Sequence, residues 1–260
     1  MSRVAVALEA AEAAGRGAFV GYLPIGFPDL RTSIDAAVTL AENGVDVLEL
    51  GPPYSDPVMD GTVIQEATEA ALSGGFRLRD TFTAVREISE RTDVPILVMT
   101  YWNPVMQYGV DRFADDLKAA GGAGVITPDI TPDAAADWIA ASERTGLDRI
   151  FLAAPTSTDE RLSMIVENST GFVYTVSTMG ITGERAQLDA AARTLVARLR
   201  EHGAARACVG IGISDAAQVA GVLEYADGAI VGTALVRALR DDGLSGLAAT
   251  ARALSAGTAR

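Results

Sequence analysis

The chain has 260 residues, a length typical of one α/β barrel, and 49% of them are hydrophobic, which is enough for a large buried core. Its formal net charge of −13 argues against nucleic acid or an anionic membrane as a partner. An acidic chain that binds a phosphate must do so locally, through backbone N–H groups and helix ends.

Short apolar runs bounded by Gly or Pro recur along the chain, as expected for parallel strands that are buried on both faces. An Ala-rich segment with helical spacing, Val4–Ala14, precedes the first run. The predicted strands are Ala18–Leu23, Val45–Leu50, Pro95–Tyr101, Gly124–Thr127, Asp148–Ala154, Gly171–Val176, Ala207–Gly210 and Gly228–Val231.

Helices are predicted between these strands and in the tail. Their expected ranges are a segment ending at Asn43, then Val63–Leu72, Arg79–Arg91, Asp111–Ala120, Pro132–Thr145, a segment ending at Glu167, Leu188–Glu201 and Asp215–Tyr225. The candidate N-caps are Asp29 or Thr32, Thr62, Ser157 or Thr158, and Ser214. Asn103-Pro104 is expected to close the third strand.

Eight strand–helix units predict the α/β class and a (β/α)8 TIM barrel with an extra N-terminal helix. We expect a single domain over residues 1–260, because no linker or break in composition interrupts the chain. The alternative is an open doubly wound sheet, but its dinucleotide fingerprint GxGxxG is missing after the first predicted strand.

Two acidic residues are candidates for catalysis. Glu49 lies near the C-terminal end of the second predicted strand, and Asp60 lies in the Pro- and Gly-rich loop that follows. A carboxyl group among Val and Leu side chains, with a raised pKa and a second carboxylate nearby, is typical of general acid/base pairs. The alternative is that Glu49 pairs with an arginine and Asp60 is a solvated loop charge.

The small numbers of lysine, histidine and cysteine argue against several other catalytic mechanisms. Lys118 is the only lysine and is expected on an outer helix, so a Schiff-base mechanism is not expected. His202 is the only histidine, and Cys208 has no second cysteine to pair with. We therefore expect no disulfide and no metal site, as suits a reducing cytosol.

Glycine-rich turns predict a phosphate site. The loops after the seventh and eighth strands of such barrels commonly hold phosphate, and here they contain Gly210–Ser214 and Gly232-Thr233. Glycine lets the backbone approach an anion, and the helix that follows supplies N–H groups. The long loop Ser177–Gln187 contains Thr182 and Gly183 and is interpreted as a lid over the barrel mouth.

The chain resembles one family closely, the α subunit of tryptophan synthase. The matching segments are Ala18–Pro28, Leu48–Pro57, Asp60-Gly61 with Gln65, Tyr101 with Asn103-Pro104, Tyr174 with Gly180–Gly183, Gly210–Ser214 and Gly232-Thr233. They cover nearly the whole chain in order, and the run that includes Leu48-Glu49-Leu50 and Ser55-Asp56-Pro57 is the most specific. Pro24 and the segment Thr127–Pro132 depart from the commonest family pattern.

The resemblance implies cleavage of indole-3-glycerol phosphate to indole and glyceraldehyde 3-phosphate, with Glu49 as the general acid/base and Asp60 at the indole N–H. It also implies substrate-binding roles for a further set of residues. They are Tyr22, Tyr101 and Tyr174 around the ring, Thr182 in the lid, and Gly183, Ile211, Gly212, Ile213, Gly232 and Thr233 at the ring and the phosphate.

The resemblance further implies a β subunit as partner in an α2β2 heterotetramer, with pyridoxal phosphate only in that partner and no cofactor in this chain. The family docks the β subunit on the mouth side, where Pro52–Pro57 and Asn103–Gly109 with Met106 are expected.

Neither a signal peptide nor a membrane span is expected, so we predict a soluble cytoplasmic protein. The alternatives are a stand-alone indole lyase, another phosphosugar barrel enzyme such as an isomerase, and a non-catalytic phosphate-binding regulatory subunit.

Overall fold

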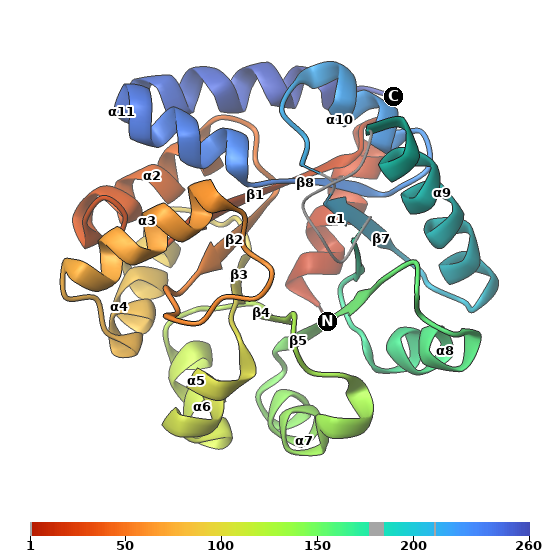
Figure 1. Cartoon of the computed structure of the whole chain (residues 1–260), viewed down its shortest axis with the longest axis horizontal. Helices are drawn as coiled ribbons and strands as arrows, with labels where there is room; N and C mark the ends of the chain where they lie inside the picture. Colours follow the sequence, from red (N-terminus) through yellow and green to blue (C-terminus); the bar gives the residue numbers. More distant parts are fainter. Residues whose placement is uncertain (1, 177–184, 211) are drawn as a thin grey trace.

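A computed structural model describes residues 2–176, 185–210 and 212–260 of the chain, and eight parallel strands in these residues form a closed barrel with helices around it (Figure 1). Each strand pairs with the next along the chain, and β8 pairs with β1 to close the barrel. The predicted (β/α)8 fold is therefore confirmed. The register places Tyr22 of β1 beside Glu49 of β2.

The strands lie close to their predicted ranges. They are β1 (Ala18–Pro24), β2 (Val47–Gly51), β3 (Ile96–Met99), β4 (Gly124–Thr127), β5 (Asp148–Ala153), β6 (Val173–Val176), β7 (Ala207–Gly210) and β8 (Gly228–Val231). The helices are α1 (Arg3–Ala13), α2 (Leu30–Glu42), α3 (Thr62–Ser73), α4 (Leu78–Ser89), α5 (Trp102–Tyr108), α6 (Val110–Ala119), α7 (Ala136–Thr145), α8 (Asp159–Asn168), α9 (Arg185–Glu201), α10 (Ala216–Leu223) and α11 (Thr233–Ser255), with 3₁₀ turns η1 (Pro132–Ala134) and η2 (Ala256–Thr258).

Helix α1 closes the N-terminal end of the barrel. Its buried residues Val4, Leu8 and Ala11 belong to one apolar cluster with the inward-facing side chains of the strands. Those strand side chains include Val20, Val47, Leu97, Ile126, Ile150, Cys208 and Ile230. Ser2 caps the helix by accepting the Ala5 N–H, and its hydroxyl donates to Asp148 at 2.7 Å. Helix α1 therefore covers the barrel interior at its N-terminal end, opposite the C-terminal mouth, where active sites of this fold lie.

Helix α5 is absent from the predicted elements, because Asn103-Pro104 is predicted to close the third strand. Pro104 instead lies in the first turn of the helix, where the missing N–H costs no hydrogen bond. The carboxylate of Asp129, in the unusual Thr127–Pro132 segment, accepts the Trp102 N–H at 2.9 Å. This cap comes from the neighbouring strand's exit loop, so local sequence could not show it.

Three predicted helix starts also differ. Gly61, with no side-chain bond, is the N-cap of α3, so the predicted Thr62 cap is wrong. Asp215 caps α10 instead of Ser214, whose N–H and hydroxyl contact Gln218 Oε1. Pro132 begins a separate 3₁₀ turn before α7. By contrast, the predicted caps Asp29 of α2 and Thr158 of α8 are confirmed.

Candidate active site

Glu49 lies on β2 at the mouth, and only 1% of its surface is exposed. Its Oε2 atom has no hydrogen-bond partner among the described residues. Burial and, as a smaller cause, the nearby charge of Asp60 together raise the pKa of this carboxyl group from 4.5 to about 8. This shift has the predicted direction, and none of the ion pairs found among the described residues joins Glu49 to an arginine. A buried, protonated carboxyl group at neutral pH can donate a proton.

Asp60 lies in the segment between β2 and α3 and is half-buried rather than a freely solvated charge. Burial raises its pKa. Its backbone carbonyl accepts a hydrogen bond from Gln65 Nε2 at 2.8 Å. Asp60 also lines a narrow cavity of about 10 Å³ together with Tyr22, Tyr101 and Pro128. The structure thus places a second acid at the mouth within electrostatic reach of Glu49.

Three tyrosines from different strands converge on this pair of acids. Tyr22 is buried in β1, and the pKa of its hydroxyl is raised well above its usual value by burial and by the charges of Asp60 and Glu49. Burial, followed by the charge of Glu49, does the same to the pKa of Tyr174 in β6. Tyr101, just beyond β3, is 7% exposed. All three remain protonated and present apolar rings, which suits an aromatic ligand.

The tyrosines explain two of the glycines. A Cβ atom built on Gly210 would lie 2.9 Å from the Tyr174 hydroxyl, and one built on Gly232 would lie 3.2 Å from the Tyr22 ring. Gly210 is the last residue of β7, Gly232 directly follows β8, and both are in the turns predicted to bind phosphate. Packing against the two tyrosines therefore favours glycine at both positions.

The helices that follow the two glycine turns differ in their N-terminal caps. Gly232 is the N-cap of α11, which begins at Thr233, is kinked at Gly243 and has no side-chain cap hydrogen bond. At α10 the carboxylate of Asp215 accepts the Gln218 N–H. Gly212 has a φ of 71°, which favours glycine, and Ile213 is buried. Of these two helix starts, only that of α10 is capped by a side chain.

Part of the predicted site lies outside the described residues: Thr182 and Gly183 of the expected lid, and Ile211. Sequence reasoning also missed one feature that the structure shows. The Tyr101 hydroxyl accepts hydrogen bonds from the backbone N–H groups of Val58 and Met59. No local pattern could indicate this contact, because it joins two loops from adjacent strands.

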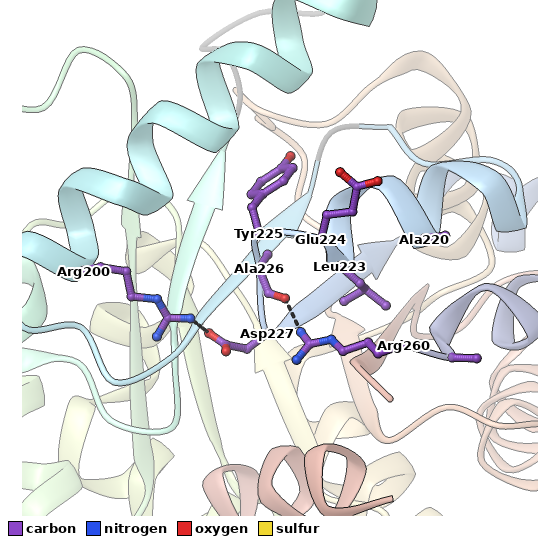
Figure 2. Close-up of a pocket in the computed structure, with 9 residues that line it drawn as sticks. Arg200, Ala220, Leu223, Glu224, Tyr225, Ala226, Asp227 and Arg260 are labelled. Carbon is purple, nitrogen blue, oxygen red and sulfur yellow. Dashed lines mark hydrogen bonds and ion pairs between the residues drawn. The ribbon is translucent and has the colours of Figure 1, made fainter. Parts of the chain in front are cut away.

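A larger cavity of about 560 Å³ lies at the opposite edge of the barrel, beside the entries to β7 and β8 (Figure 2). Its arginines already have protein partners. Arg200 donates to Asp227, which also accepts the Ala207 N–H, and Arg260 donates to the carbonyl of Ala226. These hydrogen bonds link the entries of β7 and β8 to α9 and to the C-terminal residue.

Within residues 2–176, 185–210 and 212–260, no cluster of three or more His, Cys, Asp or Glu side chains is arranged to hold a metal ion. No helix in the same ranges is long and apolar enough to span a bilayer.

The fold and the acids at its mouth define the class of this protein: a (β/α)8-barrel protein with a candidate acid/base site at the C-terminal end of its strands. The family model "Tryptophan synthase alpha chain" matches residues 8–257. The chain belongs to this family of tryptophan biosynthesis, whose members act as lyases.

Individual relatives agree with the family model. The tryptophan synthase alpha chain of Leifsonia xyli subsp. xyli is 68% identical over 260 residues, all of both chains. That of Mycobacterium avium is 55% identical over 98% of this chain and 94% of the relative. A structure of Mycobacterium tuberculosis tryptophan synthase has a chain that superposes with a TM-score of 0.94, at 52% identity, over 100% of this chain and 99% of that one.

Proposed function

We propose that this chain cleaves indole-3-glycerol phosphate to indole and D-glyceraldehyde 3-phosphate. The observation that carries the proposal is the buried carboxyl group of Glu49, with a pKa near 8, beside the second acid Asp60. Without a Schiff base, the indole ring itself must become the leaving group. That requires a proton at ring carbon C3 and a base for the ring N–H, and two acids with different environments suit those tasks.

The steps balance as follows. Protonated Glu49 gives its proton to C3, which makes an indoleninium cation, and the Asp60 carboxylate stabilises its N–H. Glu49, now ionised, takes the proton of the glycerol hydroxyl next to the ring. The bond from C3 to the side chain then breaks, its electrons return to the ring, and an aldehyde and indole leave. Each proton transfer contributes about 10²–10⁴-fold in rate.

The remaining residues of the proposed site bind the substrate. Tyr22, Tyr101 and Tyr174 surround the ring, and the phosphate binds at Gly212, Ile213, Gly232 and Thr233, with the N-terminus of α11 as its main donor. We assign Thr182, Gly183 and Ile211 to the same site from the sequence. We also propose that the chain works in the cytoplasm with a β subunit in an α2β2 complex, and that pyridoxal phosphate belongs to that partner alone.

The decisive experiment replaces the proposed acid by its neutral isostere. Glu49→Gln is expected to lower the rate of indole release from indole-3-glycerol phosphate by at least 100-fold, because the amide cannot donate the proton to C3. Binding of glycerol phosphate, measured by calorimetry, should change less than threefold. Glu90→Gln, an exposed glutamate at the end of α4, is the matched control and should keep normal turnover. Normal turnover by Glu49→Gln would refute the assignment.

A further inference from the structure

The backbone of the segment that carries Asp60 is hydrogen-bonded to the hydroxyl group of Tyr101. The Oη atom of Tyr101 accepts the Val58 N–H at 3.1 Å and the Met59 N–H at 3.0 Å. Tyr101 itself is buried and fixed by its position between β3 and α5. Val58, by contrast, is 76% exposed, so its side chain does little to hold this segment in place.

Because Asp60 directly follows Met59 in the chain, these two hydrogen bonds restrict the position of Asp60. On the other side, Gln65 of α3 donates to the Asp60 carbonyl at 2.8 Å. Asp60 is thus held between two anchors, one on the barrel wall and one on a helix. The ring of Tyr54, from the same segment, adds a contact to the Tyr101 ring with centroids 5.1 Å apart. Asn103 of α5 also donates to the Tyr54 hydroxyl, at 3.3 Å. The Tyr101 hydroxyl differs from this side-chain contact because it bonds the backbone directly beside Asp60.

We propose that Tyr101 is a positioning residue whose hydroxyl, by accepting these two backbone N–H groups, holds the Asp60 carboxylate at the proposed reaction centre. This inference rests on the proposed function, since it concerns how that site is assembled. A phenol is suited to the task because its rigid ring fixes the oxygen and its two lone pairs can accept two donors at once. A displacement of about 1 Å at a reacting group can cost about 100-fold in rate.

The burial of Asp60 supports the same conclusion. Burial raises the pKa of Asp60, and the charge of Asp60 helps to raise the pKa of Glu49. A segment released from Tyr101 would let Asp60 move toward water. The pKa of Asp60 would then fall toward its usual value, and its influence on Glu49 would weaken.

Tyr101→Phe tests the proposal, because it removes the hydroxyl and keeps the ring that contacts Tyr54. We expect kcat for indole release to fall 10- to 100-fold with KM changed less than threefold, and the acidic limb of the kcat–pH profile to move to lower pH. Amide hydrogen exchange of Val58 and Met59 should become faster. Tyr225→Phe is the matched control, because its hydroxyl donates to Asp189 on α9 rather than to the Asp60 segment.

Met59→Pro removes one of the two donors while Tyr101 stays intact, and it should lower kcat in the same direction. If Tyr101→Phe fails to fold, the kcat of Met59→Pro tests the proposal in its place. A kcat within twofold of wild type in the folded variants, or unchanged exchange at Val58 and Met59 in Tyr101→Phe, would overturn the proposal. The proposed function is refuted by a different result, namely that the wild-type chain releases no indole. In that case the amide hydrogen exchange of Val58 and Met59 in Tyr101→Phe still shows whether the hydroxyl holds the segment.

Discussion

Glu49 carries an energetic cost that follows from its role. The folded chain holds this carboxyl group away from water with no hydrogen-bond partner for Oε2 among the described residues, so the neutral form is favoured. Its pKa is about 8 in the fold, against 4.5 for the free group. The folded state therefore binds the Glu49 proton more tightly than the unfolded state between these values, and that contribution to stability is lost as the pH rises from 4.5 to 8.

The sign of this linkage gives a residue-scale prediction. Glu49→Gln cannot ionise, so it should become more stable relative to the wild type as the pH rises, by at most about 5 kcal/mol. Urea unfolding at pH 5 and pH 9 measures the difference, and the exposed control Glu90→Gln should follow the wild type at both values. A stability difference between Glu49→Gln and wild type that is the same at both pH values would show that Glu49 is not held neutral.

At the scale of elements, α1 covers one end of the barrel. It presents Leu8, 4% exposed, to the barrel interior and Val6, 43% exposed, to water. Helix α1 covers the N-terminal end of the barrel interior, and the proposed site lies at the other end, the mouth. Helix α1 and the two acids therefore lie at opposite ends of the same strands. A substitution in α1 should change the stability of the fold without changing the rate of indole release.

Leu8→Ala and Val6→Ala form a matched pair on this one helix. The buried truncation leaves a cavity and should lower the free energy of unfolding by about 2–4 kcal/mol. The exposed truncation should change it by less than about 0.5 kcal/mol. Chemical denaturation measures both values, and indole release at a temperature well below unfolding should stay normal in both variants. Equal costs for the two variants would contradict the placement of α1.

At the scale of the whole molecule, two exposed apolar side chains lie on the mouth side: Val58 at 76% and Met106 at 54%. Val58 follows β2, and Met106 lies on α5 after β3. Both are close in the chain to residues of the proposed site, Asp60 and Tyr101. A partner that covers this face would bury apolar surface and touch the segment that carries Asp60.

We expect sedimentation of this chain with a tryptophan synthase β subunit to give the mass of an α2β2 complex. Met106→Glu should weaken that complex at least tenfold, because it would bury an unpaired charge at the interface. Val6→Glu, a change of the same kind at the opposite end of the barrel, should assemble normally. Assembly unaffected by Met106→Glu would place the interface elsewhere.

Local sequence patterns were sufficient to predict the order of strands and helices and the position of Glu49 near the end of a strand. Apolar runs and the glycines and prolines beside them encode such elements within about ten residues. The direction of the Glu49 pKa shift was also predictable, because an apolar strand of a parallel barrel is buried on both faces and burial desolvates its carboxyl group.

The contacts across the mouth, by contrast, join residues that are far apart in the sequence and form only in the folded chain. The Asp129 cap of α5 and the bonds from Val58 and Met59 to Tyr101 join residues 27, 43 and 42 positions apart. Such contacts depend on the register between neighbouring strands and on the closure of the barrel, which no local pattern contains. The same is true of α5 itself, whose start is stabilised by a carboxylate from another loop.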